Sequence, residues 1–196
     1  MTQSRLLEGE FVNLRPLQVD DAELTLRWRR AQRAKFLNAG AATLEQQAAW
    51  IADRPVSEYN FIIELKSGHP VGMLSLTDID ATNRHGEPGR FLIGDEEAAK
   101  GMPVAVEAMK LLYELAFDLL GLVRVCGIVA QNNHLMLKWQ KYLGMKEEGR
   151  LRNHLCLAGQ FQDGIFIGLL VEEYRKITVP RMKVLIAAAR QRPDPR

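Results

Sequence analysis

Residues 100–105 form the first stretch whose side chains and position suit chemistry. They are Lys100, Gly101, Met102, Pro103, Val104 and Ala105. They directly precede a helical apolar pattern, and a helix start offers unpaired N–H groups and a positive dipole end to an anion such as a pyrophosphate. Pro103 removes one donor, although proline is favoured at the first helical position. The alternative is that Gly101 and Pro103 only start a packed helix.

Carboxylates at the end of a predicted strand form a second candidate. Asp78 and Asp80 alternate there, and alternate residues of a strand point to the same face. Together with Thr77 they could bind an amino or hydroxyl group of an acceptor molecule. The alternative is that they are polar residues that end the strand.

The histidines and cysteines carry a weaker signal. His134 and His154 could act as bases near neutral pH, but neither has a motif partner, so a surface or packing role is the commoner one. Cys126 and Cys156 have no neighbour at metal-ligand spacing. The sequence therefore predicts two free thiols and no metal site.

Composition favours one globular domain. The chain has 196 residues, 47% of them hydrophobic and 26% charged, with a formal net charge of +2. Basic residues are scattered among acidic ones, which does not indicate a nucleic-acid partner. No apolar stretch approaches the ~20 residues that span a bilayer, and the first residues lack a leader pattern. We therefore expect a cytoplasmic protein without membrane contact.

Hydrophobic periodicity predicts an α/β (α+β) fold with seven strands and four helices. The expected strands are 11–17, 59–65, 71–80, 91–93, 123–130, 151–157 and 161–171, and the expected helices are 22–34, 44–51, 105–119 and 135–143. Because a helix separates strands 91–93 and 123–130, these two can pair in parallel within a mostly antiparallel sheet.

A C-terminal extra helix is predicted from Met182, Leu185, Ile186 and Ala189, which recur at helical spacing. We divide the chain into a domain at 1–176 and a tail at 177–196. The apolar stripe of the tail could form a homodimer contact or pack on its own domain.

Three stretches resemble the GNAT superfamily of acetyltransferases. The order of predicted strands and helices over residues 7–175 also resembles the order in the GNAT fold. Residues 87–94 (EPGRFLIG) are similar to the family's fourth-strand segment. Residues 100–105 can be laid on its pyrophosphate loop, with Pro103 where a glycine is expected. Residues 133–145 are similar to its helix that begins with Asn and ends in Leu-Gly-Phe.

The resemblance implies a sheet with a splayed parallel pair, acetyl-CoA as co-substrate and no metal. The residues that it implies for coenzyme binding are Leu92, Ile93, Lys100, Gly101, Met102, Val104, Ala105, Asn133 and Lys138. A backbone N–H at the splay could polarise the thioester oxygen.

The family's chemistry is the attack of a neutral amine on the thioester, and an alkyl amine titrates near about 10, so a base is required. The resemblance implies Glu87 as that base, with Asp78 as a second carboxylate in the cleft. The family often takes its acid from a tyrosine where this chain has Gln140. Tyr142 is the nearby phenol, but it lies about 200° around the helix, and water is the alternative donor.

The acceptor site is expected beside the two early helices, with Trp28 and Asp80 as substrate-binding residues and Trp50 nearby. Residues 76–80 (LTDID), 89–94 (GRFLIG) and 148–152 (EGRLR) are most similar to enzymes that acetylate nucleotide-linked 4-aminosugars, and next to those that acetylate ribosomal-protein N-termini. Two other classes stay open: a silent acetyl-CoA-binding module, since Pro103 and Gln140 depart from the active pattern, and a purely structural interaction protein.

Overall fold

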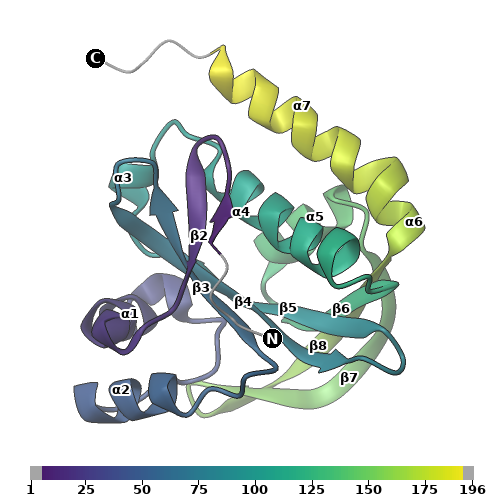
Figure 1. The fold of residues 1–196 in the computed structure, drawn as a ribbon. Helices are drawn as coiled ribbons and strands as arrows, with labels where there is room; N and C mark the ends of the chain where they lie inside the picture. The colour runs from purple at the N-terminus through teal and green to yellow at the C-terminus, as the bar shows by residue number, and fades with distance from the viewer. Residues whose placement is uncertain (1–5, 192–196) are drawn as a thin grey trace.

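An eight-stranded mixed sheet forms the centre of the computed structural model, which describes residues 6–191 (Figure 1). Its strand order is β1-β2-β3-β4-β5-β6-β8-β7. The strands are β1 (Leu7–Glu8), β2 (Val12–Pro16), β3 (Tyr59–Leu65), β4 (Pro70–Asp80), β5 (His85–Ile93), β6 (Arg124–Ala130), β7 (Lys146–Leu157) and β8 (Gln160–Leu170). Within the described chain only β5 and β6 pair in parallel.

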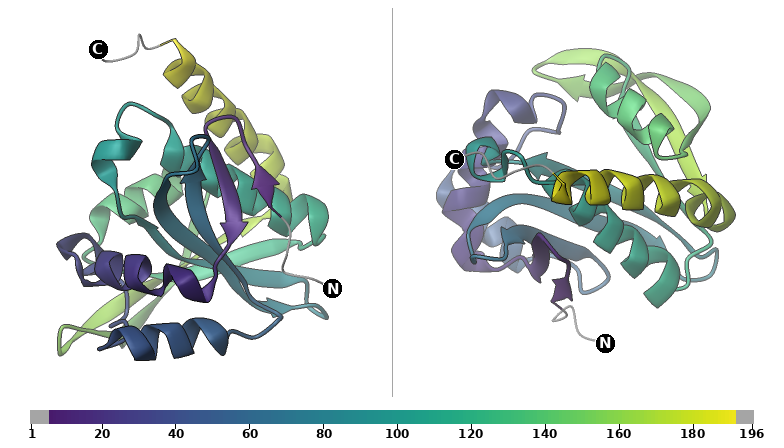
Figure 2. Two further views of the ribbon diagram at one scale, coloured as in Figure 1. Left: turned by 60° about the vertical axis from the view of Figure 1, so that its left-hand side comes forward. Right: turned by 90° about the horizontal axis from the view of Figure 1, so that it is seen from above.

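Helices cover both faces of this sheet (Figure 2). They are α1 (Ala22–Arg30), α2 (Leu44–Ala52), α3 (Glu96–Ala99), α4 (Val104–Tyr113), α5 (His134–Tyr142), α6 (Val171–Glu173) and α7 (Val179–Arg190). The predicted fold class is confirmed, including the C-terminal helix. Over residues 6–191 no helix is both long and apolar enough to cross a membrane.

The structure corrects several expected boundaries. β1 is an eighth strand whose two residues are too few for a periodic pattern. β5 begins at His85 and not at 91, because its polar first half pairs with β4. β7 likewise begins at Lys146 and not at 151. Helix α1 stops at Arg30, where Ala31 turns extended with ψ 154°.

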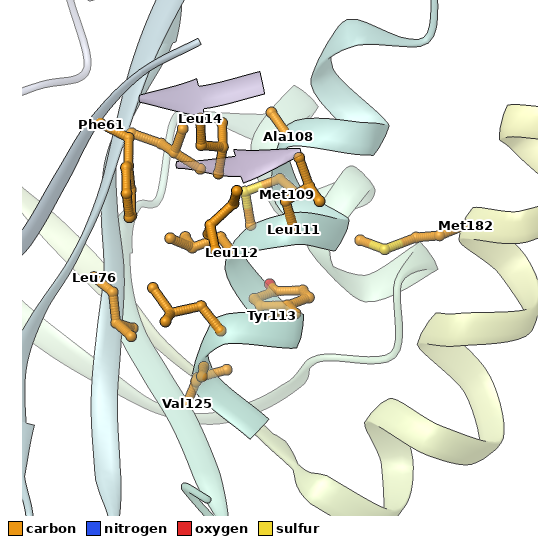
Figure 3. Packing of buried hydrophobic residues seen from close by; sticks show 14 of the residues in the cluster. Leu14, Phe61, Leu76, Ala108, Met109, Leu111, Leu112, Tyr113, Val125 and Met182 are labelled. Atoms are coloured by element: carbon orange, nitrogen blue, oxygen red, sulfur yellow. The ribbon is translucent and has the colours of Figure 1, made fainter. Parts of the chain in front are cut away.

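The main core lies between the sheet and helix α4 (Figure 3). Met109, Leu112 and Tyr113 of α4 are fully buried against strand residues such as Leu14 and Leu76. Trp28 and Leu92 belong to a smaller cluster on the opposite face, under α1. The sheet is therefore packed on both sides.

The C-terminal helix packs on its own chain. Met182 of α7 is 0% exposed and belongs to the main core, and Ile186 is also buried. Of the two alternatives for the apolar stripe, packing on its own domain is the one observed. The division of the chain into a domain at 1–176 and a tail at 177–196 stays a prediction.

A buried carboxylate ties the N-terminal strands to α4. Glu107 Oε1 accepts from Glu10 N at 2.8 Å, and its Oε2 accepts from Phe11 N at 2.6 Å and Val12 N at 2.8 Å. A Cβ on Gly9 would lie 2.7 Å from the Glu107 carboxyl carbon, so glycine is required there. One side chain thus closes the turn between β1 and β2.

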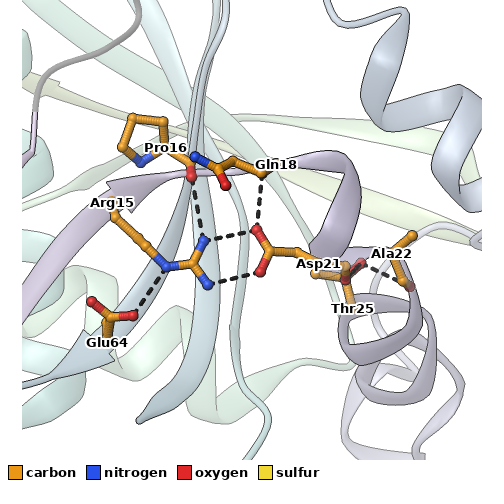
Figure 4. Close-up of polar contacts among 7 residues, drawn as sticks. All are labelled: Arg15, Pro16, Gln18, Asp21, Ala22, Thr25 and Glu64. Atoms are coloured by element: carbon orange, nitrogen blue, oxygen red, sulfur yellow. Dashed lines mark hydrogen bonds and ion pairs between the residues drawn. The ribbon is translucent and has the colours of Figure 1, made fainter. Parts of the chain in front are cut away.

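A second polar network fixes the early helices (Figure 4). Asp21 accepts from both Arg15 Nη atoms at 2.7 and 2.8 Å and from Gln18 N at 2.9 Å. Thr25 Oγ1 donates to Asp21 O at 2.8 Å and accepts from Gln47 Nε2 at 3.0 Å. The network links β2 to α1 and α1 to α2, so it sets the position of both helices on the sheet.

We predict that Glu107→Gln lowers the free energy of unfolding by about 2–3 kcal/mol, because the amide removes the charge and turns one acceptor into a donor that faces buried N–H groups. Urea unfolding would measure this loss. The control is Glu114→Gln in the following helical turns, whose carboxylate forms a half-exposed pair with Lys110 at 2.7 Å. Equal stability of the two variants would contradict the role of Glu107.

Candidate active site

The opening between β5 and β6 is the centre of the candidate site. These strands pair only at His85 with Arg124 and at Gly86 with Val125, within the described chain. Beyond these pairs, the backbone groups of β5 and β6 that face each other have no ladder partner. Such edges can bind an extended, amide-containing arm.

A bulge re-aims the backbone of β5 beside this opening. The register passes from Ser75–Gly89 to Met73–Leu92, so β5 carries one extra residue. Arg90 in the bulge has a φ of +52°, a left-handed conformation that is uncommon for a residue with a side chain. Bulges concentrate at functional sites because they redirect side chains.

An apolar groove of about 580 Å³ runs along the far half of β5. Its walls are Phe91, Leu92 and Ile93 of β5, Ala105 and Val106 of α4, and the start of α5. Phe36, Leu37 and Trp139 also line it. None of these three residues was predicted from the sequence. Phe36 and Leu37 lie in a loop, where no periodic pattern indicates a role.

The start of α4 closes one end of the groove. No side chain caps this helix, so the N–H groups of Val104, Ala105 and Val106 lack an intrahelical or capping acceptor. Gly101 has a φ of +79° in the turn before it. Pro103 is the N-cap and not the first helical residue as expected, so it removes none of these three donors. A pyrophosphate fits this arrangement.

The residues predicted for coenzyme binding fall into two groups. Leu92, Ile93, Ala105 and Asn133 line the groove. Asn133 Oδ1 caps α5 by accepting from Met136 N at 3.2 Å, which leaves its amide NH₂ as a donor.

The other predicted coenzyme residues lie away from the groove lining. Val104 is 2% exposed and its side chain packs in the main core, so only its backbone can serve. Met102 packs against the same core. Lys100 is exposed and pairs with Glu97 at 3.4 Å, and Lys138 is exposed on α5.

Glu87 lies across the opening between the two strands. It is half-buried, and its Oε1 lies 3.6 Å from the position that a Cβ on Gly127 of β6 would take. Burial raises the pKa of Glu87, the charge of Asp78 raises it further, and Arg90 opposes the shift. A carboxyl group with a raised pKa in a cleft is suited to proton transfer near neutral pH.

Asp78 and Asp80 do not share a face as predicted. The register shifts between Thr77 and Asp80, and Asp78 is the bulged residue, with a φ of +49°. Asp78 accepts from Thr77 Oγ1 at 3.0 Å and lies close enough to Glu87 to affect its pKa. Asp80 instead accepts from Asn83 N at 2.7 Å in the turn to β5.

The aromatic candidates are also placed differently. Trp28 of α1 is 4% exposed and packs on the sheet in the smaller core cluster. Tyr142 stacks on Trp139 with ring centroids 6.3 Å apart and lies under Arg181, outside the groove lining. Gln140 is buried and accepts from Tyr113 Oη at 3.4 Å. The position where the family often has its acid is thus used for packing α5 on α4.

A family model described as "Acetyltransferase (GNAT) domain" matches residues 12–146. The chain belongs to this family. Residues 6–191 contain no cluster of three or more His, Cys, Asp or Glu side chains that could hold a metal ion.

Individual acetyltransferases are similar to parts of the chain. The spermidine N(1)-acetyltransferase of Escherichia coli K12 is 28% identical over 118 residues, which are 60% of this chain and 61% of that protein. A Bacillus subtilis protein named "Putative ribosomal N-acetyltransferase YdaF" is 34% identical over 110 residues, 56% of this chain and 58% of that protein. The chain thus spans about three fifths of the length of these curated relatives.

Among solved structures, a GCN5-related N-acetyltransferase from Brucella melitensis superposes with a TM-score of 0.78 at 23% identity. The match covers 93% of this chain and 86% of that one. At this identity the similarity concerns the GNAT fold alone.

We predict that Ala105→Glu abolishes measurable acetyl-CoA binding in calorimetry, because the longer anionic side chain would enter the groove at the end suited to a pyrophosphate. Val104 is unsuitable for this test since its side chain is part of the core. Ala49→Glu, on an exposed position of α2, is the control and should bind like the wild type. Undiminished binding by Ala105→Glu would show that the coenzyme lies elsewhere.

Proposed function

We propose that this protein is an acetyl-CoA-dependent N-acetyltransferase that acts on a primary amine. The observation that carries the proposal is the position of Glu87, which crosses the opening between two unpaired strand edges. The groove that fits the pantetheine arm begins on the same strand, at Phe91. A base, a coenzyme groove and a source of free backbone donors therefore converge on β5.

In the proposed reaction the acetyl group passes from the coenzyme thiol to the acceptor amine. Glu87 takes a proton from the acceptor's ammonium group, directly or through water, so that a neutral amine is present. The amine nitrogen forms a bond to the thioester carbonyl carbon, a backbone N–H of β5 stabilises the charge on its oxygen, and the carbon–sulfur bond breaks. The nitrogen loses its second proton and the sulfur gains one, which gives an amide and the free thiol of coenzyme A.

The proton donor to the sulfur is assigned to water. Tyr142 lies against Arg181, and Tyr113 is fully buried beside Gln140. No tyrosine belongs to the groove lining in the described part of the chain. Tyr142 as the acid remains the weaker alternative.

For the acceptor we propose a nucleotide-linked 4-aminosugar, on the sequence pattern given above. The alternative is a protein N-terminus, which the relative named as a ribosomal N-acetyltransferase supports. The relative named for spermidine adds a polyamine as a third acceptor to be compared. A silent coenzyme-binding module is the outcome if coenzyme binds and no amine is acetylated.

We predict that Glu87→Gln lowers kcat/KM for the acetylated amine by about 10²-fold or more, because the amide cannot accept the proton. Acetyl-CoA affinity should stay unchanged, since Glu87 is outside the groove lining. Glu23→Gln, at an exposed position on α1, provides a control of equal charge change. Full activity of Glu87→Gln would remove Glu87 from the mechanism.

We predict that Asp78→Asn moves the acidic limb of the kcat/KM profile to lower pH. Glu87 acts when deprotonated, so activity rises as pH passes its pKa, and Asp78 raises that pKa. Asparagine also suits the left-handed backbone at this position. Arg90→Gln should move the limb in the opposite direction, because Arg90 lowers the pKa of Glu87. If neither variant moves the acidic limb of the profile, that limb reports the titration of a group other than Glu87.

A further inference from the structure

A second pocket lies on the α1 and α2 side of the sheet. It encloses about 470 Å³ and is lined by Arg29, Asn38, Gln47, Trp50, Met73 and Arg90, among others. Arg29 and Arg90 are the charged groups of its lining, and no carboxylate belongs to it in the described chain. We refer to it as the arginine pocket.

Arg29 is a half-buried cation without an acidic partner. Its Nη2 donates to the carbonyl oxygen of Asn38, and no ion pair to Arg29 occurs within residues 6–191. Burial lowers the pKa of Arg29, and the neighbouring charge of Arg90 lowers it further. Two guanidinium groups on one cavity repel each other, so an anion between them would relieve that repulsion.

Arg90 is held in a fixed geometry. Its Nη1 donates to Glu58 Oε2 at 2.9 Å and to Asn60 Oδ1 at 2.8 Å, and its guanidinium lies 5.2 Å from the ring centroid of Trp50. The bulge of β5 sets its backbone. Arg90 is thus positioned before any ligand arrives, while Arg29 retains donors for one.

The arginine pocket shares a sheet face with Glu87. Thr77 pairs with Glu87 in the sheet, and Thr77, Ser75 and Met73 alternate along β4, so they point to the same side. Met73 lines the pocket. A molecule in the pocket would therefore extend along this face toward Glu87.

Ser75 lies on the same face of β4, between Met73 and Thr77. Its side chain is fully buried, and its hydroxyl has no hydrogen-bond partner within the described residues. The hydroxyl lies 3.7 Å from where a Cβ on Gly89 would be, between the positions of Glu87 and Arg90 on β5. Ser75 is 0% exposed and does not line the pocket, so a ligand in the pocket would not contact this hydroxyl directly.

We propose that the arginine pocket binds a phosphate group of the acceptor, with Arg29 as the specificity-determining residue, and that the acceptor is a small phosphorylated amine. Arg29 would donate to the phosphate oxygens, and Arg90, which is already paired with Glu58, would add a second guanidinium group. The amine would lie at Glu87. This inference rests on the proposed acetyltransferase function. It also disfavours a polyamine, because a polycation would be placed against two guanidinium groups.

The test measures binding to protein saturated with coenzyme A, so that nucleotide probes cannot enter the coenzyme groove. Calorimetry would compare a dTDP-linked 4-amino-4,6-dideoxyglucose with spermidine and with a peptide that has an acidic second residue. Each probe is titrated into the wild type, Arg29→Gln, Arg29→Lys and the control Arg27→Gln. Arg27 is exposed on the same helix and outside the pocket lining.

We expect the nucleotide sugar to bind most tightly, and Arg29→Gln to weaken it at least about tenfold, as for loss of a charged partner in a desolvated site. Arg29→Lys should retain part of the affinity, and Arg27→Gln all of it. Thermal unfolding checks that each variant is folded. If Arg29→Gln is not folded, the affinity of Arg29→Lys still tests the proposal.

Two results would overturn the proposal: equal affinities of Arg29→Gln and Arg27→Gln, or tighter binding of spermidine or the acidic peptide than of the nucleotide sugar. Failure of the proposed function is distinguishable, because it would show as Arg29-dependent binding without acetyl transfer when acetyl-CoA replaces coenzyme A.

Discussion

The parting of β5 from β6 is the constraint on which the site depends. Two parallel strands that pair at only two positions leave backbone groups exposed in the middle of a packed sheet, and such groups need partners. The opening persists because each strand is held firmly on its other side. β4 pairs along β5, and β8 pairs with all seven residues of β6. The site is therefore a gap between two well-supported halves of the sheet.

Charged groups buried at the margins keep those halves in place. The Glu107 carboxylate fixes the turn of the first two strands to α4, whose first turn also forms the end of the coenzyme groove. The network around Asp21 connects β2 with the helices that border the arginine pocket. Stability and site geometry thus depend on the same side chains, since each network joins the sheet to an element that lines a cavity.

The two cavities differ in chemistry as the two proposed ligands do. The groove on β5 is mainly apolar and ends in free N–H groups, which suits an extended arm with a phosphate at one end. The other pocket has two guanidinium groups beside an indole ring. Under the proposed function the first cavity binds the coenzyme and the second cavity binds the acceptor.

Sequence patterns by themselves determined the fold class and the long helix before β6. Thr43 illustrates why: it caps α2, accepting from Gln46 N at 3.2 Å, and such a cap depends only on residues three apart in the sequence. Local signals of this kind survive folding. Resemblance to a family also predicted Glu87, Asn133 and Ala105 as site residues, of which Asn133 and Ala105 line the groove on β5.

Tertiary structure alone decided which side chains face a cavity. The bulges at Asp78 and Arg90 reverse the alternation that the sequence suggests, and no local pattern marks them, because each arises from the register between two strands. Packing likewise buried Trp28 and left Trp50 at a pocket. Arg29 lines a pocket because the loop that contains Asn38 folds over α1, where Arg29 donates to the carbonyl oxygen of Asn38. These two residues are nine apart in the sequence, and periodicity cannot predict such a contact.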